Sequence, residues 1–365
     1  MFGGGEKYLA CAARALKDAR PDLEVEIAAP VPVDRALVAS RLAVDLDGIG
    51  LRSTFRRVTP LHRAANKIGA LRPLRDRVLS AQGSRLAGGY DLFLPMVYGI
   101  PVNPGSAGSV MLCQFPYRRP GPEVGGFAGI VCQSQYVRRW VKSYWGRDAE
   151  VVNPPVDLPD PAPSLEDKGF VILSVGRFFS GGHGKRQDVM VEEFRRLVDG
   201  GLGGWELHLA GSVHRDAQHR GFYERVAALA RGYPIHLHPD ASHAELQTLH
   251  RRASIYWHAA GFEVVEEDEP ERLEHFGMTT AEAMGYGAVP VVYAAGGQLE
   301  IVTDRHDGRL WHTREELRRA TLDLVADPAL RRSLGETARA TAAGRFGRAR
   351  FAASLNSALE PWLPD

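Results

Sequence analysis

Apolar residues in the first 155 positions follow two different spacings. From residue 7 to residue 19 they recur every three or four positions, which predicts a helix with one buried face. Short runs rich in Val, Ile, Leu and Phe predict β-strands. The predicted strands are 25–28, 91–94, 109–114 and 129–132, and a second helix is predicted over 136–144. Strands that alternate with helices in this way favour a parallel sheet covered by helices.

A proline-rich segment interrupts the alternation near the middle of the chain. Its prolines are Pro154, Pro155, Pro159, Pro161 and Pro163. Proline has no backbone N–H and cannot continue a helix or a central strand. We therefore expect an N-terminal domain over 1–155 and a linker over 156–168.

A second series of strands and helices follows the linker. The run at 170–175 is almost continuously apolar, as expected for a strand buried on both faces. The other predicted strands are 205–210, 235–237, 254–257 and 289–293, and the predicted helices are 188–198, 222–230 and 243–251. We expect this domain to cover 169–345 and a C-terminal helix over 346–365 to pack back toward the N-terminal domain.

These patterns predict an α/β protein of two Rossmann-like, doubly wound domains that face a deep cleft. In sheets of this kind, ligands bind beyond the carboxyl ends of the strands. Residues that carry chemistry should therefore lie in the loops that follow strands.

Composition and charge exclude several classes of protein. The 365 residues contain 45 Lys and Arg against 44 Asp and Glu, a net charge of +1, whereas dedicated nucleic-acid-binding proteins are usually strongly basic. No apolar run approaches the ~18 residues of a membrane span. Cys11, Cys113 and Cys132 are odd in number and far apart. They argue against a disulfide framework and favour a reducing compartment, so we expect a cytoplasmic protein without a nucleic-acid partner.

The segment 274–282 carries the strongest candidate chemistry. It begins at Glu274 and ends at Glu282, and a helix is expected to begin near Gly277 and run to about residue 287. The first N–H groups of this helix would bind an anion such as a phosphate. Glu282, one turn further on, can accept hydrogen bonds from two sugar hydroxyls, and Glu274 can do the same beyond a diphosphate. The alternative is that Glu282 only stabilises the helix N-terminus, by about 0.3–1 kcal/mol.

Two basic residues follow the buried strand that ends at residue 175. Arg177 comes directly after Gly176, and Lys185 lies eight residues further on, behind a glycine-rich turn. A guanidinium and an ammonium fixed at the carboxyl end of a strand would clamp a pyrophosphate. The alternative is an ordinary solvated loop.

Together these features resemble the retaining glycosyltransferases of family 4, which have the GT-B fold of two Rossmann-like domains. The matching motifs are Gly4-Gly5-Glu6, Gly176-Arg177 with Lys185, and Glu274 to Glu282 with Phe276-Gly277 inside. Residues 276–291 resemble the family's F-G-x-x-x-x-E-A-M-x-x-G-x-P-V, with one extra residue before Pro290. Residues 132–134 and 153–157 match the end of the family's first domain, so the resemblance covers nearly the whole chain.

The resemblance implies transfer of a hexose-type sugar from a nucleotide-diphosphate sugar, with retention at the anomeric carbon and without a metal or other cofactor. Arg177 and Lys185 would hold the donor diphosphate and stabilise the leaving group. The backbone of Gly277, Met278 and Thr279 would bind the same phosphates. Fixed cations and helix N–H groups suit this chemistry because charge builds on the diphosphate as the glycosidic bond breaks.

The remaining donor contacts are also implied by the resemblance. Glu274 would contact the donor sugar and Glu282 the nucleotide ribose. Gly4 and Gly5 would lie under the diphosphate from the other domain. The acceptor would be a glycan, a lipid-linked sugar or a small molecule, and the donor a UDP, GDP, ADP or TDP sugar.

Two features depart from the family pattern. A strand is expected immediately before Gly3 in the natural gene product, because a glycine-rich turn that opens a helix normally follows one. Gln114 stands where many relatives have a His, and an amide cannot shuttle a proton. In a retaining mechanism the leaving phosphate can take the acceptor's proton, so Gln114 is compatible with activity. Two alternatives stay open: an inactive sugar-nucleotide-binding subunit that serves a partner enzyme, and a sugar-nucleotide epimerase of the same fold.

Several other polar residues are expected to be structural. Asp45 and Asp47 form a D-x-D that we expect in a turn. His208, His236 and His238 alternate on strands and lack the i, i+4 spacing of helical metal ligands, so core or strand-end roles are favoured. His258 follows the strand at 254–257 and is a candidate for the acceptor side.

The stretch 51–90 is strongly basic. Against the single acid Asp76 it carries nine basic residues, a net charge of +8: Arg52, Arg56, Arg57, Arg63, Lys67, Arg72, Arg75, Arg77 and Arg85. Leucines and an isoleucine are interleaved with them, which indicates a basic amphipathic surface. This surface is either an ordinary solvated face or a site for an anionic acceptor or the inner face of a membrane.

Overall fold

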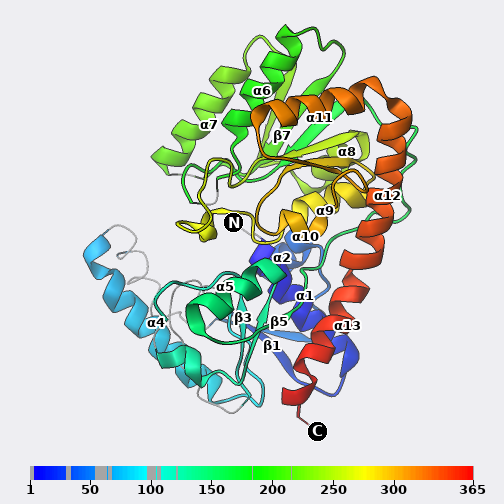
Figure 1. Cartoon of the computed structure of the whole chain (residues 1–365). Coiled ribbons are helices and arrows are strands. Elements are labelled where there is room, and N and C mark those ends of the chain that lie inside the picture. The colour runs from blue at the N-terminus through cyan, green and yellow to red at the C-terminus, as the bar shows by residue number, and fades with distance from the viewer. Residues whose placement is uncertain are drawn as a thin grey trace. The chain divides into compact units, whose positions relative to one another are not determined.

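The chain forms two compact units (Figure 1). The computed structural model describes residues 4–29, 34–53, 64, 68–96, 104, 108–120, 122–182, 184–214 and 216–364. Unit 1 consists of Met1–Pro155 and Arg348–Asp365, and unit 2 consists of Val156–Gly347.

Within its described residues, unit 1 holds two small parallel sheets instead of one continuous sheet. The first pairs β1 (Val25–Ala29) with β2 (Ile49–Ser53). The second has the order β3-β4-β5, with β3 at Val110–Cys113, β4 at Gly129–Cys132 and β5 at Glu150–Val151. Helices and parallel strands therefore alternate as the sequence predicts, but the strands are divided between two sheets.

The strand predicted over 91–94 does not form as a full strand. Phe93 and Met96 make single parallel bridges to Ser109 and Leu112. Pro95 lies between them and has no N–H to contribute to a ladder, which limits the pairing to isolated bridges.

The described residues of the N-terminal part of unit 1 form the helices α1 (Gly4–Ala19), α2 (Arg35–Leu42), α4 (Arg72–Ala87) and α5 (Gln135–Trp145). Helix α1 begins three residues before the predicted start at residue 7, so Gly4 and Gly5 belong to its first turn. Helix α13 (Arg348–Leu359) joins unit 1 from the far end of the chain. Its Phe351 ring meets Tyr8 of α1 edge-on, with 5.1 Å between ring centroids.

Unit 1 contains an apolar cavity of about 630 Å³. Its wall is formed by α1, β1, α4 and the segment 91–96. The apolar side chains that line it include Leu9, Ala13, Ile27, Leu79, Leu92 and Leu94. The cavity therefore borders both β1 and the incomplete strand at 91–96.

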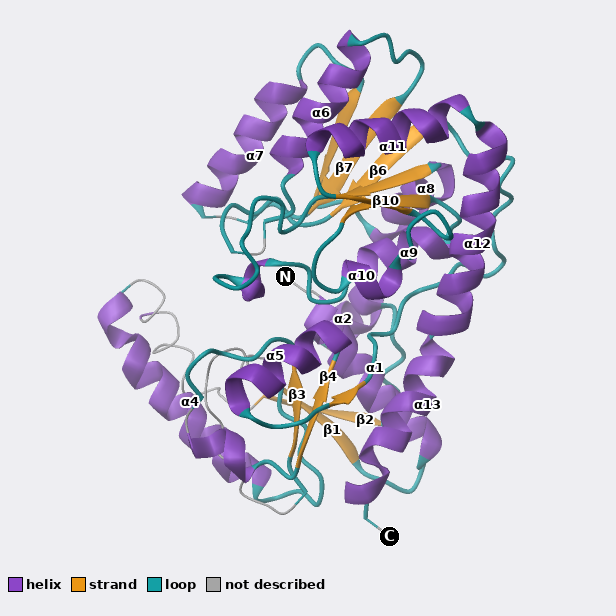
Figure 2. Cartoon of the chain, viewed as in Figure 1, coloured by secondary structure: helices purple, strands orange, loops and turns teal. Residues whose placement is uncertain are grey.

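Unit 2 is built on one six-stranded parallel sheet (Figure 2). Its order is β11-β10-β9-β6-β7-β8, so β6 (Val171–Val175) has β9 (Ile255–His258) and β7 (Glu206–Gly211) as neighbours. The other strands are β8 (Ile235–Pro239), β10 (Val289–Tyr293) and β11 (Arg309–Trp311).

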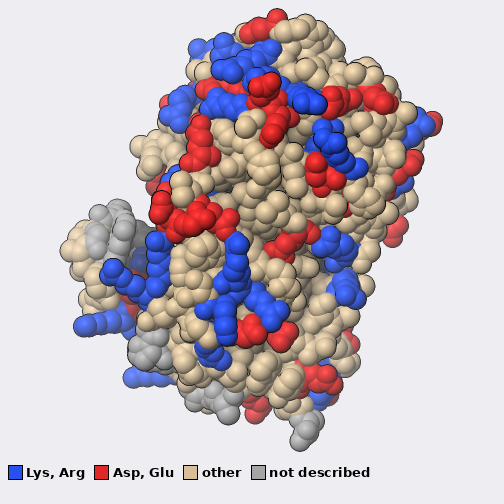
Figure 3. Space-filling model, in the orientation of Figure 1, with Lys and Arg blue, Asp and Glu red and all other residues tan. Residues whose placement is uncertain are grey.

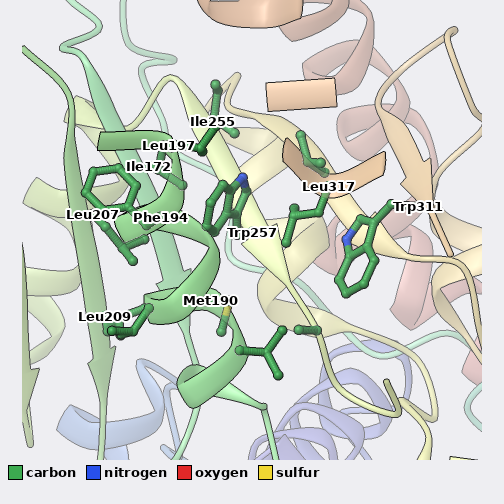
Figure 4. Packing of buried hydrophobic residues seen from close by; sticks show 14 of the residues in the cluster. Ile172, Met190, Phe194, Leu197, Leu207, Leu209, Ile255, Trp257, Trp311 and Leu317 are labelled. Carbon is green, nitrogen blue, oxygen red and sulfur yellow. The ribbon is translucent and has the colours of Figure 1, made fainter. Parts of the chain in front are cut away.

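Helices cover both faces of this sheet. They are α6 (Gln187–Asp199), α7 (Ala217–Ala230), α8 (His243–Arg252), α9 (Met278–Gly285), α10 (Gln298–Ile301), α11 (Arg314–Ala326) and α12 (Pro328–Phe346). On one face, Met190 and Phe194 of α6 pack on the strand residues Ile172, Leu207 and Trp257 (Figure 4). On the other face, α8 and α9 pack against the same strands. Unit 2 is thus doubly wound, as predicted.

The segment expected to be a linker, 156–168, packs onto unit 2. The Val156 N–H donates to the carbonyl oxygen of Phe346 at 3.0 Å, and Leu158 contacts the backbone near Gly285. Val156 is fully buried, which explains why this proline-rich stretch is part of the unit.

In the part of the chain that the structure describes, no helix is both long and apolar enough to cross a lipid bilayer.

Candidate active site

A buried carboxylate with two basic partners lies at the carboxyl end of the unit 2 sheet. The Lys185 ammonium donates a hydrogen bond to Glu274 Oε2. His258 Nε2 lies 3.0 Å from the same oxygen. The His258 side chain is only 1% exposed and the Glu274 side chain 14% exposed, so water screens these contacts little. Of the residues that the sequence singled out as candidates for the donor or acceptor site, these three are brought into direct contact.

The electrostatics of this cluster keep the carboxylate charged. Burial by itself would raise the pKa of Glu274, but the Lys185 ammonium and the His258 hydrogen bond together hold that pKa well below its ordinary value. Burial lowers the pKa of His258 despite the neighbouring carboxylate. His258 is therefore neutral near pH 7, where it donates its Nε2 proton to Glu274.

Close packing at the end of β6 positions Lys185. A Cβ added at Gly176, directly after this strand, would lie 2.6 Å from Cγ of Lys185. The lysine stem therefore passes against the Gly176 backbone, and only glycine leaves room for it. This explains physically why the glycine precedes Arg177 in the sequence.

The second element of the site is the N-terminus of α9. Gly277 precedes it with φ +112°, in the region that favours glycine. The first N–H that bonds back is that of Thr280, to the Gly277 carbonyl oxygen at 3.0 Å. The N–H groups of Gly277, Met278 and Thr279 precede that bond, and donors at such a position suit an anion. The predicted helix start is therefore confirmed to within one residue, although the helix ends at Gly285, before the expected residue 287.

Two supports for this site were not singled out in the sequence. The Tyr256 hydroxyl lies 2.7 Å from Thr279 Oγ1 and 3.3 Å from the Val175 carbonyl oxygen, so it ties α9 to the end of β6. The Gly297 N–H donates to the Glu274 carbonyl oxygen at 2.7 Å, and a Cβ at Gly297 would lie 2.5 Å from Cα of Phe276. The only sequence signal for the second support was the Gly296-Gly297 pair after a strand.

Arg177 and Glu282 occupy the same part of unit 2 outside the central cluster. Arg177 is exposed, and its guanidinium lies 5.7 Å from the centre of the Phe179 ring. The hydrogen bonds and ion pairs of the described residues do not connect it to Lys185 or Glu274. Glu282 is half-buried, one turn into α9.

Three candidate residues belong to unit 1. Gly4 and Gly5 form the first turn of α1, where Gly5 is buried and Gly4 exposed. Gln114 follows β3, and its amide nitrogen lies 3.2 Å from the sulfur of Met96. The amide of Gln114 can therefore form hydrogen bonds, but it does not titrate near neutral pH.

The geometry of unit 2 suits a ligand that carries both phosphate and hydroxyl groups. The ammonium of Lys185 and the N–H groups at the start of α9 are donors for an anion. Glu274, which contacts Lys185, is an ionised acceptor to which a hydroxyl can donate a hydrogen bond.

Comparison with known proteins bears on the family and the fold. Residues 160–341 match the model of the family described as glycosyl transferases group 1. A glycosyltransferase from Rickettsia africae has a similar structure, with a TM-score of 0.68 and 17% sequence identity, over 99% of this chain and 94% of that chain. Anabaena HepE, crystallised with UDP-glucose, has a TM-score of 0.71 and 15% identity over 99% and 97% of the two chains. Sucrose-phosphate synthase from Thermosynechococcus elongatus has a TM-score of 0.67 and 14% identity over 97% and 92%. The curated proteins include no match to the sequence.

The predicted α/β fold of two Rossmann-like domains is therefore confirmed, because the structural neighbours are GT-B glycosyltransferases with parallel sheets. Residues 160–341, which make up most of unit 2, are similar to the glycosyl transferases group 1 family.

Proposed function

We propose that this protein transfers a hexose-type sugar from a nucleotide-diphosphate sugar to an acceptor, with retention of the anomeric configuration and without a metal ion, in the biosynthesis of a glycan or glycolipid. The observation that carries the proposal is the contact of Lys185 with Glu274, which lies shortly before the N-terminus of α9. These residues lie within the segment that matches the glycosyl transferases group 1 family. Anabaena HepE, a structural neighbour, was crystallised with UDP-glucose, which supports a nucleotide sugar as donor.

In this proposal the diphosphate lies at the N-terminus of α9. The N–H groups of Gly277, Met278 and Thr279 bind its oxygens, and Lys185 and Arg177 supply positive charge. These groups are fixed before the reaction begins, so they stabilise the charge that develops as the glycosidic bond breaks. A metal ion is then not needed to neutralise the leaving group.

Glu274 and Glu282 take the hydroxyl groups of the donor. Glu274 is ionised and held by Lys185 and His258, so its second oxygen is available to a sugar hydroxyl. Glu282 accepts hydrogen bonds from the ribose. His258 acts through Glu274 as a positioning residue, because its neutral ring donates to that carboxylate.

Retention requires the acceptor to attack from the face that the leaving group occupies. The departing diphosphate is then close to the acceptor hydroxyl and takes its proton. No side chain has to act as base, which is consistent with an amide at Gln114 on the acceptor side.

The test is a thermal-shift screen with UDP, GDP, ADP and TDP sugars, followed by a transfer assay with the donor that binds. A ligand at a hundred times its Kd adds about 2.7 kcal/mol to the stability of the native state. NMR of the product reports the anomeric configuration, and the rate should be unchanged in EDTA.

Conversion of the donor to an isomerised sugar in the absence of an acceptor would indicate an epimerase. Binding with neither transfer nor hydrolysis would indicate an inactive subunit. An inverted product, or a rate that collapses in EDTA and returns with Mg²⁺ or Mn²⁺, would contradict the mechanism.

Loss of the Glu282 carboxylate is expected to weaken donor binding. Glu282→Ala should cost roughly 1.5–3 kcal/mol, the range for hydrogen bonds to a charged group. Isothermal titration with the nucleoside diphosphate measures the loss, and Glu336→Ala, an exposed glutamate in α12, is the matched control. The melting temperature without ligand should be similar in both variants. Equal affinity of Glu282→Ala and wild type for the nucleoside diphosphate would show that Glu282 does not bind the ribose.

The basic stretch 51–90 is proposed as a surface for anionic membrane. Arg56, Arg57, Arg63 and Lys67 lie outside the described residues, and Arg52 in β2 pairs with Glu26 at 3.6 Å. Figure 3 shows Lys and Arg side chains gathered on unit 1 over α4 and α5. The exposed basic residues of these helices include Arg77, Arg85, Arg139 and Lys142.

Removal of two α4 arginines is expected to weaken vesicle binding. Each basic residue near an anionic surface contributes about 1 kcal/mol, so the double variant Arg77→Ser, Arg85→Ser should lower partitioning roughly thirtyfold at low salt. Sedimentation with anionic and neutral vesicles measures it, and Arg319→Ser, Arg350→Ser in other exposed helices is the control. If wild type sediments with neither kind of vesicle, the acceptor is a soluble molecule and the surface is only solvated.

A further inference from the structure

Three histidines and a glutamate lie together on one face of the unit 2 sheet, at its β8 edge. His208 of β7 stands opposite His236 of β8 in the parallel register, and Ala210 stands opposite His238. Side chains two residues apart on a strand point to the same face, so Glu206 and His208 project on the same side as His236 and His238. The sequence shows these residues only as alternate positions on two strands, and the pairing of β7 with β8 brings them together.

Their ligating atoms are close enough to share one metal ion. A carboxylate oxygen of Glu206 and one ring nitrogen each of His208 and His236 all lie within 4.8 Å of one another. Glu206 Oε2 is 3.1 Å from His208 Nε2, and Glu206 Oε1 is 3.7 Å from His236 Nε2. Ligands at the usual 2.0–2.1 Å from a tetrahedral Zn²⁺ are about 3.3 Å apart. Small side-chain adjustments therefore suffice to place an ion between the three groups.

His238 orients the most buried of these ligands. Its Nε2 lies 2.9 Å from Nδ1 of His208, and the two rings are stacked with 5.1 Å between centroids. When His208 Nδ1 carries the proton, it donates a hydrogen bond to His238 Nε2. The lone pair of His208 Nε2 then points toward Glu206. An outer partner of this kind fixes the tautomer and direction of a metal-binding histidine.

One cation competes for the carboxylate. Nη2 of Arg252, the last residue of α8, lies 3.5 Å from Glu206 Oε2. Without a metal, the cluster is an ordinary ion pair with a histidine hydrogen bond. The Arg252 and Glu206 side chains are 53% and 38% exposed, so that ion pair contributes little. The Arg252–Glu206 ion pair also does not explain why the His236 ring lies beside the same carboxylate.

We propose that Glu206, His208 and His236 form a binding site for Zn²⁺ or a similar divalent transition metal, with His238 as its outer partner. Two imidazoles and one carboxylate are a common zinc ligand set, completed by water. The ion would join the edge strand β8 to β7. Glu206 and His236 lie at the amino-terminal ends of their strands, whereas Lys185 and His258 lie at the carboxyl end of the sheet. The site is therefore separate from the metal-free chemistry proposed for the donor.

The experiment is a titration of the full, untagged chain with ZnCl₂ after removal of metal by EDTA. Wild type is expected to bind one Zn²⁺ at this site, and the bound ion is expected to raise the melting temperature. His236→Ala, at an exposed side chain, should lower the Zn²⁺ affinity at least about tenfold, the loss that even an outer partner causes. Arg252→Gln should instead tighten Zn²⁺ binding several-fold, because it removes the competing cation. The rate of sugar transfer should be the same with and without Zn²⁺.

Two control variants locate the bound ion. His306→Ala removes an exposed histidine outside any such cluster and should bind Zn²⁺ like wild type. His214, Asp216 and His219 form a second group of possible ligands within the described residues. His214→Ala should also leave the titration unchanged. Loss of binding in His214→Ala but not in His236→Ala would overturn the proposal, as would a wild-type chain that binds no Zn²⁺.

Discussion

Replacing Lys185 with alanine is expected to lower kcat by about 10²–10³-fold, the effect of removing one donor that stabilises charge in a transition state. KM for the donor should change less, because the negative charge that Lys185 meets grows as the leaving diphosphate departs. Steady-state kinetics over a range of donor concentrations separates the two constants.

The same substitution leaves Glu274 with one partner fewer, so stability has to be measured alongside activity. Lys185→Gln keeps a hydrogen-bond donor near Glu274 without the charge, and it should remain folded while losing a similar factor in kcat. Arg319→Ala, at an exposed arginine of α11, is the control and should behave like wild type. If folded Lys185→Gln retains the wild-type kcat, Lys185 does not stabilise the leaving group.

Replacing His250 with phenylalanine is expected to reduce the loss of stability in acid. His250 is 5% exposed in α8, and its ring stacks on Tyr286 with 5.1 Å between centroids. Burial, assisted by the positive charge of Lys168, lowers the pKa of His250 from 6.5 to about 3. The unfolded chain takes up this proton below pH 6.5 and the folded chain only near pH 3. Folding stability therefore falls as the pH drops through that window, by about 2 kcal/mol at pH 5.

Urea unfolding of wild type and His250→Phe at pH 7 and pH 5 measures this difference. Phenylalanine keeps the stack on Tyr286 and removes His250 Nδ1, which finds no hydrogen-bond partner among the described residues. The variant should still lose some stability in acid, since burial also lowers the pKa values of His208 and His258. His306→Phe, at an exposed histidine, should follow wild type. An equal loss between pH 7 and pH 5 in wild type and His250→Phe would contradict the prediction.

Strands β6 to β10 of unit 2 could be predicted from the sequence because most of them are short apolar runs bounded by turn residues, whereas β11 was not predicted. The run at 170–175 corresponds to β6, and the run at 289–293 corresponds to β10 with the same bounds. In unit 1, apolar runs were a weaker guide to the strands. Residues 91–94 have the composition of a strand, but Pro95 and the partners available there allow only isolated bridges.

The candidate site could be predicted only in part. The Glu274–Glu282 segment and the helix start at Gly277 could be predicted because their residues lie close together in the sequence. The contact of Lys185 and His258 with one oxygen of Glu274 was not, because β6 and β9 are neighbours in the sheet although two strands separate them in the chain. His258 was a candidate for the acceptor side, which stays a prediction, and the structure places its Nε2 against Glu274.

By itself, the amino-acid sequence determined the alternation of strands and helices, the division near residue 155 and the residue types that a diphosphate needs. These follow from local spacing, since the period of apolar residues reports which face of an element is buried. Only the tertiary structure decided what covers each face: which strand lies beside β6, how Gly297 supports the backbone at Glu274, and that His208 and His236 meet across β7 and β8. The physical reason is that strand order in a parallel sheet depends on the packing of residues far apart in the chain, which no local pattern encodes.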